Sequence, residues 1–558
     1  MFKEVTQRKV GTLISLSVAL VTLFVTPYST LDPINVPKLW VLLALAFGVV
    51  GVLFLEIKPL FNKENWAPII AAKLVFVFML IAMLVSSAPI SQQLFGTYGR
   101  NTGLLTYLAF VILFIGAAVA SSKSIKKPFL IAFGLAIGIN ALYGAIQALG
   151  KDPQKWSNPY APVIGTLGNP NFVSAFLGMG VALALSYLVS QNLDIKYRAM
   201  SALYILVALY DILKSDAQQG LIVSLLSVGL VGYFLLKSKI KSTGIRLGYL
   251  SLGVFAFLVG VAGTLQKGPL ASILYKPSVT YRGDYWHAGI EMFKKHPFFG
   301  VGLDSYGDWY RASRTLAATV RRGPSTVSNA AHNVYIDIAA TAGIFALIAY
   351  LAVIFLGFRT AYKIAKRTTE FDPFFVGIFV AWVGYLIQSA ISINNIALGI
   401  WGWVLPGVLI SMERWGNDSN KPAQNKQSTK VKSVTDFSGM GIVAGLIIGG
   451  VIGFLPFNSD ANFRHALESG NPDNINKAAL KSPTDAARIL YAAQVFHQNK
   501  MQDKAVVLAR ETVKLNARNF DGWNYLYNSS SVSGNEKREI LDRLKALDPH
   551  NPDLKKLG

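Results

Sequence analysis

Long apolar segments recur along this chain and constrain its fold more than any other feature. Each is close to the length of about 20 residues that a helix needs to cross a lipid bilayer. The thirteen ranges are 11–27, 37–56, 67–88, 102–120, 128–149, 170–190, 198–213, 220–236, 245–266, 332–357, 373–393, 396–412 and 439–456. With 52% hydrophobic residues, lipid is the expected solvent of this chain. We predict an all-α, polytopic membrane bundle of about 12–13 transmembrane helices. The number is given as a range because one of the thirteen segments, 198–213, is short and carries Asp211.

Lys and Arg are distributed unevenly between the two sides of this bundle. With a cytoplasmic N-terminus, the cytoplasmic loops hold 23 of them and the short loops opposite hold five. Positively charged residues collect on the cytoplasmic side of membrane proteins. The N-terminus is therefore predicted to be cytoplasmic and the C-terminal residues extracytoplasmic. Topology accounts for much of the net charge of +23, and no nucleic-acid partner is predicted.

The large loop at 267–330 departs from this charge rule. It carries nine basic and four acidic residues, a net charge of +5, on the predicted outer side. Either it holds an anion, or it is a long loop that crosses the membrane regardless of charge. Residues 281–307 predict an amphipathic helix that ends near His296-Pro297, followed by a glycine-rich turn. Arg282 near its start is either a phosphate ligand or a solvated side chain, and Trp286 is expected at headgroup depth.

The C-terminal residues 459–558 predict a separate helical domain. Leu480, Leu515 and Leu547 begin corresponding stretches 35 and 32 residues apart, a spacing typical of tetratricopeptide-like repeats. Stacked helical hairpins of this kind form a docking surface for protein or for an extended ligand. The predicted organisation has four parts, namely a membrane core at 1–413, a cytoplasmic linker at 414–438, an additional transmembrane helix at 439–456 and the extracytoplasmic repeats at 459–558.

The inventory of reactive residues is small. The chain has no cysteine, and its six histidines show no metal-ligand spacing. The acidic pair Glu370 and Asp372 lies on the predicted cytoplasmic side. Neither a G-x-S-x-G sequence nor a phosphate-binding glycine loop is present. We therefore predict a site with no metal and no cofactor.

His332 stands out because it lies at the start of the apolar range 332–357, directly in front of its apolar run. A histidine at a helix start is usually structural, since the ring can cap backbone groups or lie among lipid headgroups. The functional alternative is a general base, because an imidazole pKa of about 6.5 is close to working pH.

Several stretches resemble the O-antigen ligase superfamily. His332-Asn333, followed after nine residues by Gly343, matches the signature of that family, and R-x-x-x-W from Arg282 followed by HPFFGVG matches its large outer loop. Further matching stretches, in family order, are DPINVPK (32–38), FGTYGRNTG (95–103), GTLGNPNFVSAFLG (165–178) and SDAQQG (215–220).

This resemblance implies a metal-independent membrane glycosyltransferase of lipopolysaccharide or cell-surface glycan biosynthesis. Such an enzyme takes a glycan from undecaprenyl diphosphate on the outer face of the bacterial plasma (inner) membrane and passes it to an acceptor hydroxyl of a glycolipid or a protein, with membrane lipid as its surroundings. Carried over, the catalytic candidates are His332 as base and Arg282 as phosphate contact. The substrate-binding candidates it implies are Arg100, Lys214, Gln219, Asn169, Asn171 and Asn333.

Two positions depart from the family pattern. Gln219 stands where relatives often have an arginine, which removes one charge contact to the diphosphate, and Lys214 is the expected substitute. Ala346, three residues after Gly343, replaces a second small or hydroxyl residue and remains compatible with close helix packing.

The sequence leaves the acceptor open. Relatives include ligases that act on lipid-anchored saccharides, repeat-unit polymerases, and O-oligosaccharyltransferases that modify Ser or Thr of secreted proteins. The repeats favour a protein partner, so protein glycosylation is a serious alternative. A secondary transporter is less favoured, because it is expected to carry intramembrane charges and similar halves. A non-catalytic scaffold built around the repeats is the least favoured alternative, because it gives His332 no role.

Overall fold

The computed structural model describes residues 3–156, 161–191, 193–418 and 438–557. Within these residues every regular element is a helix and none is a strand. The predicted all-α class is therefore confirmed. Most of the expected linker at 414–438 lies outside the described residues.

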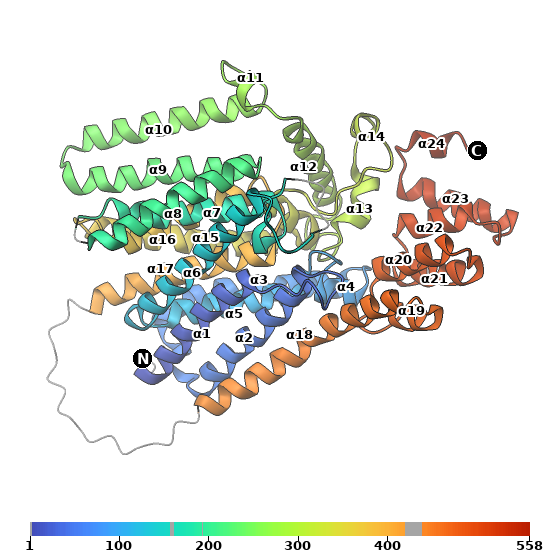
Figure 1. Cartoon of the computed structure of the whole chain (residues 1–558), viewed down its shortest axis with the longest axis horizontal. Coiled ribbons are helices and arrows are strands. Elements are labelled where there is room, and N and C mark those ends of the chain that lie inside the picture. Colours follow the sequence, from blue (N-terminus) through green and yellow to red (C-terminus); the bar gives the residue numbers. More distant parts are fainter. Residues whose placement is uncertain (1–2, 157–160, 192, 419–437, 558) are drawn as a thin grey trace.

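Thirteen long helices form the bundle, and each coincides with one of the apolar ranges expected from the sequence (Figure 1). They are α1 (Glu4–Leu23), α2 (Asn35–Leu55), α3 (Lys63–Val85), α5 (Leu104–Val119), α6 (Ser122–Ala148), α7 (Pro170–Leu188), α8 (Ile195–Lys214), α9 (Gln218–Lys239), α10 (Thr243–Thr264), α15 (Val334–Arg367), α16 (Pro373–Ser389), α17 (Ile396–Asp418) and α18 (Ser438–Ser469). Among the described residues, nine helices are long and apolar enough to cross a membrane, and α5 and α16 are apolar but shorter. The chain is a multi-pass membrane protein.

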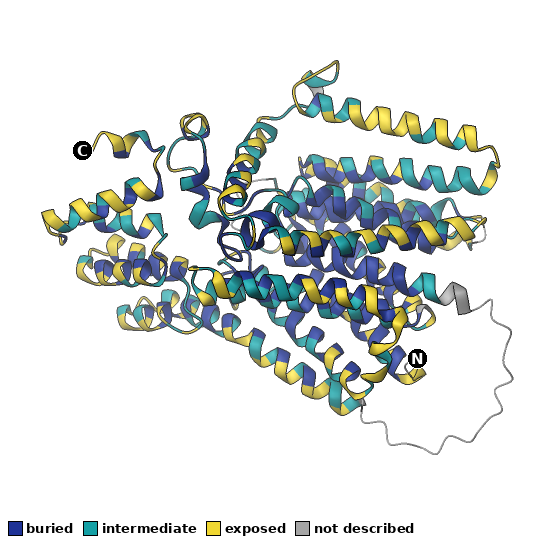
Figure 2. Ribbon diagram, turned by 180° about the vertical axis from the view of Figure 1, so that it is seen from behind, coloured by how far each residue is buried: buried dark blue, intermediate teal, exposed yellow. Residues whose placement is uncertain are grey.

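Burial separates the centre of the bundle from its periphery. In the most apolar stretch of α17, 89% of residues are buried, compared with 0% in α10. Figure 2 shows α10 exposed along its length. An apolar helix without protein neighbours is stable in lipid, where its side chains need no other cover. In the centre, Trp401 stacks against Phe133 with ring centroids 4.3 Å apart.

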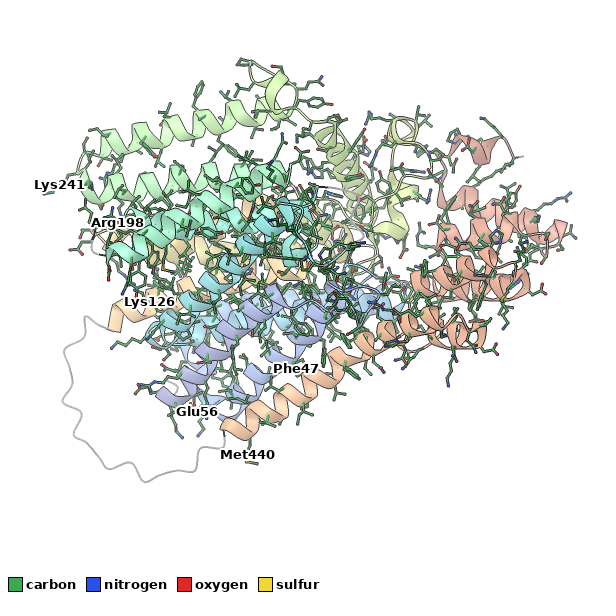
Figure 3. All side chains as sticks on the ribbon, in the orientation of Figure 1. Phe47, Glu56, Lys126, Arg198, Lys241 and Met440 are labelled. Atoms are coloured by element: carbon green, nitrogen blue, oxygen red, sulfur yellow. The ribbon has the colours of Figure 1, made fainter. Side chains whose placement is uncertain are left out.

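Short helices lie at one end of the bundle, which we call the loop end. They are α4 (Ile90–Phe95), α11 (Ala271–Leu274), α12 (Pro277–Lys295), α13 (Tyr306–Ser313) and α14 (Leu316–Arg322). Elsewhere in the chain there are two 3-10 turns, η1 (Lys58–Phe61) and η2 (Gly165–Leu167). The predicted amphipathic helix corresponds to α12, which ends with His296 as C-cap. Lys126, Arg198 and Lys241 all lie at the opposite end of the bundle (Figure 3).

The C-terminal helices form a compact tail beside α13 and α14 (Figure 1). They are α19 (Pro472–Ala479), α20 (Ala486–Gln498), α21 (Gln502–Leu515), α22 (Phe520–Asn528), α23 (Gly534–Leu547) and α24 (Pro552–Lys555). Helices α20 and α21 pack against each other, as do α22 and α23. Helix α18 runs without interruption from the bundle to Ser469, so the last membrane helix and the start of the tail are one element.

Glycines bring α18 close to α2. Gly441, Gly445, Gly449 and Gly453 recur every four residues, and an added Cβ on any of them would collide with the backbone of α2. Small residues at this spacing allow two helix backbones to approach in a membrane. This contact fixes α18, and through it the tail, to the core.

Buried charges hold the tail against the large loop. Asp548, fully buried just beyond α23, accepts hydrogen bonds from Arg314 at 2.7 Å and from Arg311 at 3.3 Å. The guanidinium of Arg518 lies 3.5 Å from the ring centroid of Trp309 on α13. Because buried ion pairs need well-formed partners on both sides, these contacts fix one placement of the tail on the loop.

Candidate active site

Helix α15 is broken at Gly343. This residue has φ 81° and ψ −177°, a conformation open essentially to glycine alone, and it divides α15 into a short segment and a long one. The backbone of the HPFFGVG motif enters the break. Ile344 donates to the carbonyl of Pro297 at 2.9 Å, and Val301 donates to the carbonyl of Ala340 at 2.9 Å. Backbone groups freed by the break are thereby paired.

Two glycines make this close approach possible. A Cβ on Gly343 would overlap the carbonyl of Phe298, and a Cβ on Gly300 would lie 2.6 Å from the carbonyl oxygen of Ala340. The nine residues between His332-Asn333 and Gly343 therefore form a short helix that the motif locks in place. The spacing read from the sequence has this physical cause.

His332 lies just outside the helix, although the apolar range 332–357 placed it inside. Helix α15 begins at Val334, and Asn333 is its N-cap. The Asn333 side-chain oxygen accepts from Tyr335 at 3.0 Å and Ile336 at 3.1 Å, which satisfies free backbone donors of the first turn. His332 itself has φ 53°, in the left-handed region. The asparagine caps the helix, so the histidine ring is left to face other groups.

The ring of His332 stacks on Tyr285 of α12, with centroids 4.8 Å apart. The indole of Trp286 donates to the backbone carbonyl of His332 at 3.3 Å. This hydrogen bond fixes the indole of Trp286, and the expected position of Trp286 at headgroup depth stays a prediction. Neighbouring aromatic residues of α12 thus hold both the ring and the backbone of the histidine.

Three arginines lie close enough to His332 to act on its charge. Burial, followed by the charges of Arg282, Arg100 and Arg322, lowers the pKa of the histidine to about 3. Burial and nearby cations both disfavour the protonated ring. The imidazole is therefore neutral at neutral pH and has a lone pair to accept a proton. Two of these arginines, Arg282 and Arg100, are predicted site residues, and the structure brings them together with His332.

Arg282 has no hydrogen-bond or ion-pair partner among the described residues. Its Nε is buried without a hydrogen bond, and the side chain makes no ion pair with any described residue. Burial lowers the pKa of Arg282, and no carboxylate offsets that effect. A partly buried guanidinium without an anion is unfavourable, so its surroundings are suited to an anionic ligand.

Arg100 is only partly satisfied. Its Nη1 donates to the carbonyl of Asn329 at 2.8 Å, and its Nε lies 3.8 Å from Asp304. Nε and Nη2 of Arg100 are buried without hydrogen bonds. Arg322 donates to the Tyr285 hydroxyl and lies 4.4 Å from the ring of Tyr281. The cluster therefore holds free N–H groups on two of its arginines.

Two carboxylates near this cluster were not singled out from the sequence. Asp304 accepts from the backbone of Thr97 at 2.7 Å and from the Thr102 hydroxyl at 3.2 Å, which fixes the loop that carries Arg100. Asp337 accepts from the backbone of Ala331 at 2.9 Å, beside His332. For Asp337 a sequence signal was available, because a carboxylate in the first turn of an apolar helix is unusual in a membrane span. Arg322 was also missed, although it was one of the basic loop residues.

Two of the remaining predicted residues, Asn333 and Gln219, contact the end of α16. Asn333 donates to the carbonyl of Ala390 at 2.9 Å, at the end of α16. Gln219 is buried and accepts from Gln388, also on α16, at 3.5 Å. These contacts tie the start of α9 to the same helix end as the histidine motif. The side-chain amides of Asn333 and Gln219 are therefore both held by the end of α16.

Asn169, Asn171 and Lys214 are not joined to His332 by any contact in the described chain. Asn169 is the N-cap of α7, and its side-chain oxygen accepts from the backbone of Asn171 at 2.9 Å. Lys214, exposed at the last residue of α8, lies 5.8 Å from the ring of Tyr210 and forms no ion pair. Their substrate-binding roles stay predictions.

One part of the chain matches a known protein family. Residues 174–351 match the family model for O-antigen ligase. This ligase match spans about a third of the chain and includes Arg282, His332 and Gly343, whereas Arg100 and the tail lie outside it. It supports a membrane glycosyltransferase of the O-antigen ligase superfamily. No curated protein matches the chain.

The described residues contain no group of three or more His, Asp or Glu side chains that could hold a metal ion. The expectation of a metal-independent reaction remains a prediction, which metal removal from the active protein would test. The positively charged groups near His332 are arginines, a residue type that binds phosphate through paired N–H groups.

Proposed function

We propose that this protein moves a glycan from undecaprenyl diphosphate to an acceptor hydroxyl. The observation that carries the proposal is the pairing of a neutral His332 with two arginines whose buried N–H groups have no partner. A diphosphate supplies the missing negative charge, and a hydroxyl supplies the proton that the imidazole accepts. The match to the O-antigen ligase family supports the same reaction class.

The reaction follows from these groups. Arg282 and Arg100 bind the diphosphate and stabilise the charge that grows on it as it leaves. His332 takes the proton of the acceptor hydroxyl while the oxygen attacks the anomeric carbon. One bond forms between that oxygen and the carbon, and the bond from the carbon to the diphosphate oxygen breaks. A single displacement of this kind inverts the anomeric centre.

The distribution of charge supports an orientation. The basic loop residues Lys126, Arg198 and Lys241 lie at the end away from the tail (Figure 3). We assign that end to the cytoplasm, in agreement with the charge rule for membrane proteins. The ligase site and the tail then face outward from a bacterial plasma membrane. The paired helices α20–α21 and α22–α23 support a tetratricopeptide-like tail, whose free surface is suited to a protein partner.

Replacement of Arg282 by alanine is expected to lower kcat/KM for the lipid-linked donor by about 10- to 100-fold, in line with the loss of one hydrogen bond to a charged group. The assay follows glycan transfer by purified protein from the undecaprenyl diphosphate donor. Arg321→Ala is the matched control, because Arg321 is exposed and pairs with Asp284 at 2.6 Å. Equal rates for wild type and a folded Arg282→Ala protein would remove the phosphate role.

The product identifies the acceptor. Mass spectrometry of the transferred glycan is expected to show a glycolipid for a ligase, a modified Ser or Thr for an O-oligosaccharyltransferase, and a longer lipid-linked glycan for a polymerase. We favour the ligase reading because the family match carries that description.

The pH dependence of the reaction is expected to differ between free and donor-bound protein. Protonation of His332 removes the base, and in the free protein that occurs only near pH 3. Bound diphosphate offsets the arginine charges and raises the pKa of the histidine. The fall of kcat at acid pH, which reports the complex, should therefore begin at higher pH than the fall of kcat/KM, which reports the free protein. Measured between pH 4 and pH 8, kcat should fall toward pH 4 while kcat/KM stays level, and acid limbs that coincide within this range would contradict the prediction.

A further inference from the structure

A cleft lies where the bundle meets the tail, separate from the histidine cluster. It is lined by α2, α4, the loop around residues 96–101, α18 and the residues at the start of α20. The sequence had singled out the stretch that carries Arg100 and the C-terminal repeats as binding surfaces, but not α2 or α4. The cleft joins parts of the chain that are several hundred residues apart.

Two buried side chains in this cleft have acceptor oxygens that are not fully paired. The side chain of Asn101 is 4% exposed and its Oδ1 accepts no hydrogen bond, while its Nδ2 donates to the carbonyl of Phe95 at 3.3 Å. Asp460 is 2% exposed; the Tyr98 hydroxyl hydrogen-bonds to its carboxylate, and Oδ1 has no further partner among the described residues. Its Oδ2 accepts from the backbone of Leu31 at 2.7 Å and Asp32 at 2.9 Å. Unpaired buried acceptors in a native structure point to a missing donor.

The other lining groups indicate the chemistry of that donor. Phe95 and Tyr98 contribute aromatic rings, and the Tyr98 hydroxyl hydrogen-bonds to Asp460. Arg488, the cation of the cleft, donates to the carbonyl of Ala479 at 3.1 Å and to the Ser459 hydroxyl at 2.5 Å. Its contacts hold the start of α20 and leave it poorly placed to bind a phosphate. Free carboxylate and amide oxygens beside aromatic rings are suited to a ligand with many hydroxyl groups and apolar C–H faces.

Asn101 also places the cleft next to the ligase site. It follows Arg100, whose charge acts on His332. We propose that this cleft is a saccharide subsite that binds sugar hydroxyls of a glycan substrate through Asn101 and Asp460. This inference rests on the proposed function for its biological meaning, although saccharide binding itself is measured without transfer. The sugar belongs either to the donor glycan or to the acceptor, and both present the same hydroxyl chemistry.

Thr484→Trp fills the cleft from its rim. The backbone carbonyl of Thr484 accepts from the Ser91 hydroxyl at 2.7 Å, a bond that the substitution keeps. Ala487→Trp is the matched control, because Ala487 is exposed in the first turn of α20, three residues after Thr484, and lies outside the cleft lining. Asp460→Asn is a second variant of nearly unchanged shape, in which the free acceptor becomes a donor.

Binding is measured by saturation-transfer NMR on the full chain in detergent. One probe is the glycan released by mild acid from the lipid-linked donor, and the other is the delipidated core oligosaccharide of the cell's surface glycolipid. We expect at least one probe to bind wild type and Ala487→Trp equally, and to bind Thr484→Trp and Asp460→Asn at least about 10-fold more weakly. The probe that binds identifies the source of the sugar.

Absence of binding by both probes to wild type, or equal binding by all folded variants, would overturn the subsite. Failure of the proposed function is a separate outcome, in which wild-type protein transfers no glycan from the lipid-linked donor. Because the NMR measurement needs no transfer, the two failures are distinguished.

Discussion

Replacement of His332 is expected to lower kcat by about 100- to 10,000-fold, the contribution typical of a general base. The ring is neutral, stacked on Tyr285, and lies near the arginines that we propose to bind the diphosphate. His332→Asn is a better test than His332→Ala, because His332 has φ 53° and asparagine tolerates this left-handed conformation. Transfer from the lipid-linked donor, measured under single-turnover conditions, gives the rate.

The control for this loss is His287→Asn. His287 lies on the same helix as Tyr285 but is exposed, so its replacement should leave the rate of transfer unchanged. Donor binding should persist in His332→Asn, because Arg282 and Arg100 remain. A folded His332→Asn protein with the wild-type rate would show that the histidine is structural.

Gly343→Ala is expected to destabilise the protein by about 4 kcal/mol, the sum of a backbone conformation reserved for glycine and a steric overlap in a packed core. The added Cβ would meet the carbonyl of Phe298, and φ is 81°. The inserted HPFFGVG backbone would have to move away, which breaks the hydrogen bond from Ile344 to Pro297. We expect a lower apparent Tm in detergent and loss of transfer, because this segment connects α12 to the histidine motif.

Gly134→Ala is the matched control for this prediction. Gly134 lies within α6, and nothing is within 4 Å of the position that its Cβ would occupy. Alanine is a better helix former than glycine, so the apparent Tm should stay the same or rise slightly. Equal Tm values for Gly343→Ala and wild type would mean that the break in α15 is not required.

The tail has a structural connection to the histidine cluster. Asp548 binds Arg311 and Arg314 on the large loop. Helix α14 of the same loop ends in Arg322, which donates to the hydroxyl of Tyr285, and the Tyr285 ring stacks on His332. A glycan in the proposed cleft would lie between this tail and the core. The placement of the tail therefore bears on both the arginine cluster and the saccharide subsite.

Apolar runs along the sequence determined the helices of the membrane bundle, because the bilayer requires about 20 apolar residues for each span. Proline chemistry likewise determined the end of α12 at His296-Pro297. The position of His332 ahead of an apolar helix was also visible, since capping and helix starts are local. The reason for Gly343 was not, because the clash that it avoids comes from Phe298 on another segment.

Only the tertiary structure decided which charges meet. Arg100 reaches Asn329 across 229 residues of sequence, and Asp304 holds the Arg100 loop across more than 200 residues. A sequence gives the number of arginines in a loop but not which of them lack a carboxylate partner, because that depends on contacts between distant segments. The free N–H groups of Arg282 and Arg100 beside a neutral imidazole are a product of packing, and they carry the proposed chemistry.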